Sequence, residues 1–137
     1  MQRRDFIKLG AVSSAALLLP SQVAAATNAN TVNFAGMAYF TAEQQGRWQG
    51  KAGGHLPKVE ITKGIATVTT KHAMTEAHYI VKHTLFNEQM ELLSETVFSL
   101  KNGDKPVSQH DLKGYQGKIY AVSLCNLHDA WVAEAVA

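Results

Sequence analysis

Cysteine is nearly absent from this 137-residue sequence, which contains a single one at position 125. A lone cysteine excludes a disulfide bond within the chain. Three roles remain for its thiol: pairing with another chain, burial as an inert side chain, or binding a metal ion. The residues around it therefore decide which chemistry is open to this protein.

A long apolar run is also missing, since none reaches the roughly 20 residues that a membrane-spanning helix needs. One shorter run, residues 9–19, follows Arg3 and Arg4 and leads to small residues in an A-x-A pattern. This layout is typical of a secretory signal, and the paired arginines indicate the twin-arginine type. We expect residues 1–26 to be a signal peptide and residues 27–137 the mature domain. The twin-arginine translocase would then be a partner during export, with the periplasm as destination and no membrane span after cleavage.

An excess of one charge sign is the third absence. The formal net charge is +2, and this surplus comes from Arg3, Arg4 and Lys8 against Asp5 in the predicted signal. Positive and negative side chains balance in the rest of the chain. A balanced domain of this kind lacks the basic surface of nucleic-acid-binding proteins, so we expect no nucleic-acid partner.

The sequence does contain a series of short β-rich segments separated by turns. Residues 55–72 alternate apolar and polar side chains around a turn at Lys63-Gly64. Further β-rich segments follow at residues 78–87 and 90–100, and a last strand is expected at residues 118–124. Asn102-Gly103 marks another turn. Regularly spaced short strands of this type predict an all-β, antiparallel sandwich.

Histidine is the residue whose placement points to chemistry. Four histidines and the cysteine lie at the ends of predicted strands, where loops can converge on one site: His55, His72, His78, Cys125 and His128. The other two histidines are expected to play no part. His83 lies within a strand and should be structural or at the surface, and His110 lies in a polar segment and should be exposed.

The side chains in this set restrict the chemistry that they can support. Neutral imidazole binds zinc, copper, iron and nickel, and a thiolate adds a soft ligand. The C-x-x-H spacing of Cys125 and His128 fits a loop that supplies two ligands. That motif is weak by itself, so the residues alone leave the metal open.

Three segments together carry a more specific resemblance. The stretches "GGHLPKVE", "KHAMTEAHYI" and "LCNLHDAW" resemble the iron-binding segments of superoxide reductases, which include neelaredoxins and the iron domain of desulfoferrodoxin. The order of the segments matches, as do the six-residue step from His72 to His78 and the three-residue step from Cys125 to His128. The resemblance covers residues 47–134.

The resemblance implies an immunoglobulin-like β-sandwich that holds one mononuclear, non-haem iron. His55, His72, His78 and His128 would be planar ligands and Cys125 the axial one. The backbone amides of Leu127 and His128 would donate hydrogen bonds to the sulfur. The implied reaction is the one-electron reduction of superoxide to hydrogen peroxide, with iron passing between Fe(II) and Fe(III). No four-cysteine, rubredoxin-like segment is present, so an external redox protein would supply electrons. Related proteins often form dimers or tetramers, so a homo-oligomer is a further expectation.

The sequence departs from the family directly before the first histidine. Family members commonly carry Glu-Lys there, whereas this chain has Gly53 and Gly54. The family lysine attracts superoxide and helps to deliver protons. Lys51 is close enough in sequence to take over this role and is our candidate catalytic residue. Lys58 and Lys71 also neighbour expected ligands, but we interpret them as surface residues.

Three alternatives remain open at the level of sequence. The first is a periplasmic iron protein that transfers electrons or binds a small ligand such as NO without efficient superoxide reduction. The second is a cupredoxin, but blue-copper sites usually add an axial methionine. No methionine follows Met90, and two histidines would have no role. The third is a partner-binding domain with a degenerate metal site, which the full set of ligands disfavours.

Overall fold

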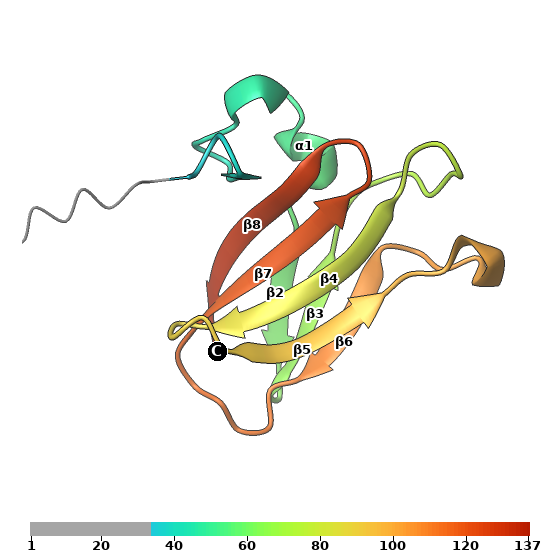
Figure 1. Cartoon of the computed structure of the whole chain (residues 1–137). Helices are drawn as coiled ribbons and strands as arrows, with labels where there is room; N and C mark the ends of the chain where they lie inside the picture. Colours follow the sequence, from blue (N-terminus) through green and yellow to red (C-terminus); the bar gives the residue numbers. More distant parts are fainter. Residues whose placement is uncertain (1–33) are drawn as a thin grey trace, which may run out of the picture. The chain divides into compact units, whose positions relative to one another are not determined.

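The computed structural model describes residues 34–137, which form a sandwich of two β-sheets (Figure 1). The larger sheet has the strand order β1-β8-β7-β4-β5 and the smaller one the order β2-β3-β6. The predicted all-β, immunoglobulin-like sandwich is thereby confirmed. Neighbouring strands run antiparallel, except that the two-residue strand β1 runs parallel to β8. The predicted signal peptide, residues 1–26, lies outside the described residues.

Eight strands and three short helical segments make up the described part of the chain. The strands are β1 Tyr39–Phe40, β2 Lys58–Thr62, β3 Ile65–Thr69, β4 Ile80–Asn87, β5 Leu92–Val97, β6 Val107–Asp111, β7 Lys118–Cys125 and β8 Asp129–Val136. The helical segments are η2 Gly46–Trp48, α1 Ala52–His55 and η3 Leu100–Asn102. Within residues 34–137, no helix has the length and apolar character needed to cross a bilayer.

The turn predicted between β2 and β3 is present. Lys63 and Gly64 have φ angles of 50° and 77°, and Thr62 pairs with Ile65 across them. Positive φ at both central residues is typical of the tight hairpin turns whose twist matches that of the strands. The hairpin buries Ala66 and Val68 in the sandwich.

Besides the two-residue strand β1, two longer strands were not predicted from the sequence. Residues 118–124 were expected to be the last strand, but β8 follows and pairs with β7 along its whole length. Alanine-rich segments have low intrinsic β propensity, and here the pairing with β7 outweighs it. Strand β6 was missed because its inward residues are polar. The expectation that His110 is exposed was therefore wrong: His110 lies in β6, points inward and is fully buried.

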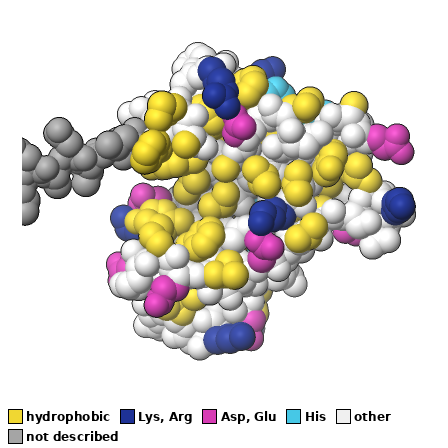
Figure 2. Space-filling view, viewed as in Figure 1, with side chains coloured by type: hydrophobic (Ala, Val, Ile, Leu, Met, Phe, Trp, Pro, Cys, Tyr) yellow, Lys and Arg dark blue, Asp and Glu magenta, His cyan; other side chains and the backbone are white. Residues whose placement is uncertain are grey.

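The interior contains an apolar cluster, and the outer face of the larger sheet is also rich in apolar side chains. The buried cluster comprises Ala66, Val68, Leu85, Leu112, Ile119 and Ala121. Apolar side chains form a broad band across the face that β8, β7 and β4 present to the viewer (Figure 2). A hollow of about 910 Å³ on this face is lined by Tyr120, Val122 and Val132, among others.

Candidate metal centre

Three connections meet at one end of the sandwich, the upper end in Figure 1. Helix α1 ends at His55 just before β2. The connection from β3 to β4 contains His72 and His78, and the turn from β7 to β8 contains Cys125 and His128. All five candidate residues thus come from segments that the sandwich brings to the same end.

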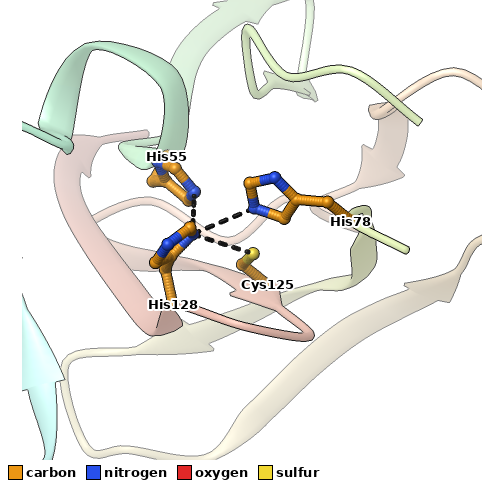
Figure 3. Close-up of side chains that lie close together, drawn as sticks. All are labelled: His55, His78, Cys125 and His128. Carbon is orange, nitrogen blue, oxygen red and sulfur yellow. Dashed lines mark hydrogen bonds between the residues drawn. The ribbon is translucent and has the colours of Figure 1, made fainter. Parts of the chain in front are cut away.

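The four imidazoles form a ring of neighbouring nitrogens. His72 Nε2 lies 3.0 Å from His78 Nε2. His78 Nε2 lies 2.9 Å from His128 Nδ1, which in turn lies 2.9 Å from His55 Nε2. Figure 3 shows the rings of His55, His78 and His128 directed toward one another. The order around the ring is therefore His72, His78, His128 and His55.

The distances between the ring centroids show that the arrangement is closed. Neighbouring imidazole centroids are separated by 4.7 Å for His55 and His72, 4.3 Å for His72 and His78, 4.7 Å for His78 and His128, and 4.6 Å for His55 and His128. Each neighbouring pair meets edge to face. His55 and His78 are 5.7 Å apart, as expected for residues on opposite sides of the ring. The four side chains thus form a closed square rather than a chain.

Cys125 lies beside this square on the side of the protein interior. Its Sγ is 3.7 Å from His128 Nδ1 (Figure 3), and the residue is only 3% exposed. The nearest ligand atoms of His55, His78, Cys125 and His128 all lie within 4.8 Å of one another. His72 is outside that closest group, although its Nε2 contacts His78.

The sulfur and the histidines are oriented by backbone groups. Of the two amides expected to donate to Cys125 Sγ, that of Leu127 does so at 3.5 Å, whereas the described residues show no such bond from His128. His55 Nδ1–H donates to the Lys51 carbonyl at 2.8 Å, and His72 Nδ1–H donates to the Ala73 carbonyl. Carbonyl oxygens only accept, so these bonds fix the tautomer and leave Nε2 of both rings as a lone-pair donor.

Asn126 ties the cysteine turn to the loop that contains His78. Its side-chain oxygen accepts from the Tyr79 amide at 2.9 Å, and its side-chain nitrogen donates to the Ala77 carbonyl at 3.0 Å. The Asn126 amide also donates to the Tyr79 carbonyl at 3.1 Å. These three bonds fix the separation between Cys125 and His78.

A second brace holds His128 and was not predicted from the sequence. Asp129 has a φ of 62° and accepts from Trp48 Nε1 at 2.8 Å and from the Arg47 guanidinium. The Trp48 ring meets the His128 imidazole edge to face at 4.6 Å. On the other side, Trp131 Nε1 donates to the His128 carbonyl at 2.9 Å. More than 80 residues separate Trp48 from Asp129 in sequence, so no local spacing signals this contact.

The electrostatics favour neutral imidazoles. The pKa of His55 is lowered from 6.5 to about 4, mainly by burial and also by the charges of the neighbouring histidines. The pKa values of His78 and His128 are lowered mainly by burial and also by neighbouring charges, among them that of Lys51. These three rings are therefore neutral at neutral pH, with lone pairs available for a cation.

The arrangement fits a single transition-metal ion. Four nitrogens at about 2.1 Å from a common centre in one plane would be separated by about 3.0 Å along each edge of the square. The three measured edges are 3.0, 2.9 and 2.9 Å. Imidazole nitrogens with one soft thiolate suit iron, copper or zinc rather than magnesium or calcium.

The positions around the first histidine explain which lysine is near the centre. Lys51 is the residue before helix α1, and it lies one helical turn ahead of His55, the last residue of that helix. Lys58 pairs with Glu60 on the exposed side of β2 at 2.9 Å, and Lys71 is exposed. A Cβ atom at Gly53 would have open space, and one at Gly54 would make only an ordinary 3.6 Å contact with the Lys71 carbonyl.

Comparison with known proteins gives one consistent family. A sequence model of the family described as desulfoferrodoxin matches residues 46–134. The chain is 34% identical over 98 residues to a desulfoferrodoxin of Nitratidesulfovibrio vulgaris, which covers 67% of this chain and 71% of that protein.

Solved structures of superoxide reductases are similar to this chain as well. The neelaredoxin-type superoxide reductase of Ignicoccus hospitalis aligns with a TM-score of 0.57 and 25% identity, over 74% of this chain and 94% of that one. The superoxide reductase of Giardia intestinalis aligns with a TM-score of 0.51 and 25% identity, over 61% of this chain and 97% of that one.

Proposed function

The chain belongs to the desulfoferrodoxin family, and on this premise we propose that it is a superoxide reductase. Its reaction is the one-electron reduction of superoxide to hydrogen peroxide at one non-haem iron. His55, His72, His78 and His128 are the proposed nitrogen ligands, and Cys125 is the proposed sulfur ligand. The observation that carries the proposal is the square of imidazoles with a buried thiol on its inner side.

The reaction is balanced by one electron and two protons for each superoxide. An iron ion held by these four histidines and Cys125 would supply the electron by passing from Fe(II) to Fe(III). The proposed electron donor is an external redox protein, as the family resemblance implies. The side chains divide the remaining tasks between the two faces of the square.

Cys125 is 3% exposed and occupies the inner side, whereas His72, His78 and His128 are only partly buried. The outer side of the square is thereby left to a small anion from solvent. The charge of Lys51 reaches His78 and His128 strongly enough to lower the pKa of both. A positive charge there attracts superoxide, so we propose that Lys51 takes the role of the lysine that is missing at Gly54.

The test is the reaction of the reduced, iron-loaded protein with superoxide. Pulse radiolysis should show oxidation of the iron much faster than superoxide disappears without protein, with hydrogen peroxide as the product. The matched control is the same protein loaded with zinc, which has no redox chemistry. Equal rates for the iron and zinc forms would refute the proposal.

A second candidate function is kept because of Gly53 and Gly54. A periplasmic iron protein for electron transfer, or for binding a ligand such as NO, would need the five ligands but no positive charge beside them. Slow oxidation by superoxide, combined with a tight and reversible NO complex of the reduced protein, would favour this alternative.

We also propose export to the periplasm by the twin-arginine route. Arg3 and Arg4 before a mild apolar run support it. Replacing both with lysine should leave an unprocessed precursor in the cytoplasm. Mature protein in the periplasm of cells that express this variant would argue for another route. Self-association, expected from the family resemblance, stays a prediction that sedimentation analysis can test.

A further inference from the structure

A row of polar side chains crosses the interior of the sandwich directly below the metal centre. We call it the polar ladder, and its members, in order, are Ser94, His110, Ser108, His83, Thr70 and Ser123. Five of the six are at most 5% exposed, and Ser94 is partly buried. A sandwich interior is normally filled by apolar side chains, so this row requires an explanation.

The ladder is continuous. His110 Nδ1 lies 2.8 Å from Ser94 Oγ, and His110 Nε2 lies 2.7 Å from Ser108 Oγ. Ser108 Oγ lies 2.8 Å from His83 Nδ1, and His83 Nε2 lies 2.9 Å from Thr70 Oγ1. The Thr70 hydroxyl donates to Ser123 Oγ at 2.8 Å.

The hydrogen bonds of the ladder have one common direction. Burial lowers the pKa of His83 to about 4 and also lowers that of His110, so both rings are neutral at neutral pH. A neutral imidazole has one donor and one acceptor. Because Thr70 donates to Ser123, His83 must donate to Thr70 and accept from Ser108, which in turn accepts from His110. Loss of any one member leaves a buried neighbour unpaired.

The ladder also links the two sheets. Ser123, His83 and Ser94 belong to β7, β4 and β5 of the larger sheet, whereas Ser108 and His110 belong to β6 of the smaller one. Thr70 directly follows β3 of the smaller sheet. Every hydrogen bond of the polar ladder except the one between Ser108 and His110 therefore connects one sheet with the other. Together these bonds fix the offset of the two sheets.

The upper end of the ladder lies next to two candidate ligands. The Thr70 carbonyl accepts from the His72 amide at 2.8 Å. Ser123 precedes Cys125 by two residues on the same inward-facing row of β7. Ser123 also pairs with His83 on one side and with Trp131 on the other. The contact between Thr70 and Ser123 thus joins the segment that leads to His72 with the strand that leads to Cys125.

We propose that the polar ladder sets the position of Cys125 relative to His72, and that His83 is a positioning residue for the metal centre. This inference rests on the proposed iron site. Cys125 comes from the larger sheet and His72 follows the smaller one, so their separation depends on the offset of the sheets. Apolar packing is non-directional and leaves that offset loosely defined, whereas hydrogen bonds fix it. The position of Cys125 relative to His72 depends mainly on the contact between Thr70 and Ser123. The ladder bonds toward Ser94 contribute less.

Two conservative variants of His83 separate the two sides of the ladder. His83→Gln places an amide nitrogen near the position of Nε2, which keeps the bond to Thr70 and gives up the one to Ser108. His83→Asn reaches only the position of Nδ1, which keeps Ser108 and gives up Thr70. Both variants lose one buried hydrogen bond, so a merely structural role predicts similar effects for the two.

The measurement is the rate at which a thiol reagent modifies Cys125 in the protein as purified, since Cys125 is the only thiol. We expect His83→Asn to react about tenfold faster than the unmodified protein, and His83→Gln within about twofold of it. The matched control is Leu112→Ala, which destabilises the apolar cluster at the other end of the sandwich and should leave the rate unchanged. Equal rates for the two His83 variants, or an Asn rate no higher than that of Leu112→Ala, would overturn the inference.

A second pair of variants covers the case in which the His83 variants fail to fold. Ser123→Ala removes the upper end of the ladder and should speed the modification, whereas Ser94→Ala removes the lower end and should not. Equal effects of these two would again overturn the inference. The Fe(III)–thiolate absorption band, recorded for each variant, separates the two proposals. Absence of the band in the unmodified protein refutes the iron site, while the modification rates still decide the role of the ladder.

Discussion

The six histidines fall into two groups whose comparison shows what makes a metal site. His83 and His110 lie in the interior, and each ring has both nitrogens bonded to hydroxyl groups. The other four form a square at the end of the sandwich, and its nitrogens face one another. The buried pair is satisfied by the protein itself, whereas the square has several lone pairs directed at one point.

A lowered pKa does not distinguish these groups. Burial lowers the pKa of His83 and that of His55 to about 4. The partners of the rings do distinguish them. His55 donates its Nδ1–H to a carbonyl oxygen and directs Nε2 at its neighbours in the square. This pattern is typical of metal-binding histidines. The comparison therefore assigns function by hydrogen-bond partner rather than by burial.

The largest expected effect comes from replacing Cys125, the sulfur ligand beside the square. Cys125→Ser should abolish the Fe(III)–thiolate absorption band of the iron-loaded protein, because a hydroxyl is a much harder and weaker ligand. The free energy of unfolding of the metal-free protein should change by about 1 kcal/mol or less. Absorption spectra and urea unfolding test the two parts. A band that survives the substitution would show that Cys125 does not bind the iron.

The buried pair should behave in the opposite way. His83→Ala leaves the hydroxyls of Thr70 and Ser108 without their partner and opens a cavity, so we expect a loss of about 3 kcal/mol in the free energy of unfolding. The matched control is His72→Ala in the square, which should cost about 1 kcal/mol or less in the metal-free protein. Urea unfolding of both variants is the test. Equal losses would erase the distinction between the two groups.

Much of this distinction was visible in the sequence. The hairpin turn at Lys63-Gly64, the sandwich, and the position of four histidines and Cys125 at strand ends followed from alternation and turn residues. His83 was expected to be structural or exposed, and it is structural. The convergence was predictable because strand ends of a sandwich meet at its edges, wherever the strands lie in the sequence.

The remainder depends on contacts between distant segments. The burial of His110 could not be inferred, because the inner row of β6 is polar and resembles a surface segment. The contact of Trp48 and Arg47 with Asp129 likewise joins segments that no periodicity connects. Hydrogen-bond partners of this kind are set by the packing of the sheets, which a single sequence does not reveal.

Acid should destabilise the metal-free protein in part through the buried pair. Folding lowers the pKa of His83 from 6.5 to about 4, so the unfolded chain takes up the proton first as the pH falls. The stability that His83 contributes is complete above about pH 6.5 and is lost as the pH falls toward 4, by about 3 kcal/mol at most. His83→Gln cannot titrate and should lose less over this range. If the free energy of unfolding falls by the same amount in both proteins as the pH is lowered, this account is contradicted.

The smallest expected effect concerns charge, and it should touch the square alone. The charge of Lys51 lowers the pKa of His78 and His128, whereas its influence is not among the causes that lower the pKa of His83 or His110. Lys51→Ala should therefore slow the reaction of the reduced iron protein with superoxide by a few fold without changing stability. The effect should shrink as ionic strength rises, since salt screens the attraction of an exposed lysine for an anion.

The converse experiment introduces a lysine at Gly54, where family members commonly carry one. Gly54 has space for a side chain, since an added Cβ meets only the Lys71 carbonyl at 3.6 Å. Gly54→Lys should raise the rate, steepen its dependence on salt, and restore the rate when combined with Lys51→Ala.

Lys58→Ala is the matched control for Lys51→Ala, because Lys58 is paired with Glu60 and should have no effect. Stopped-flow or pulse-radiolysis rates at two ionic strengths decide the matter. If Lys51→Ala and Lys58→Ala react alike, Lys51 has not replaced the missing lysine, and the attraction of superoxide must come from the metal site itself.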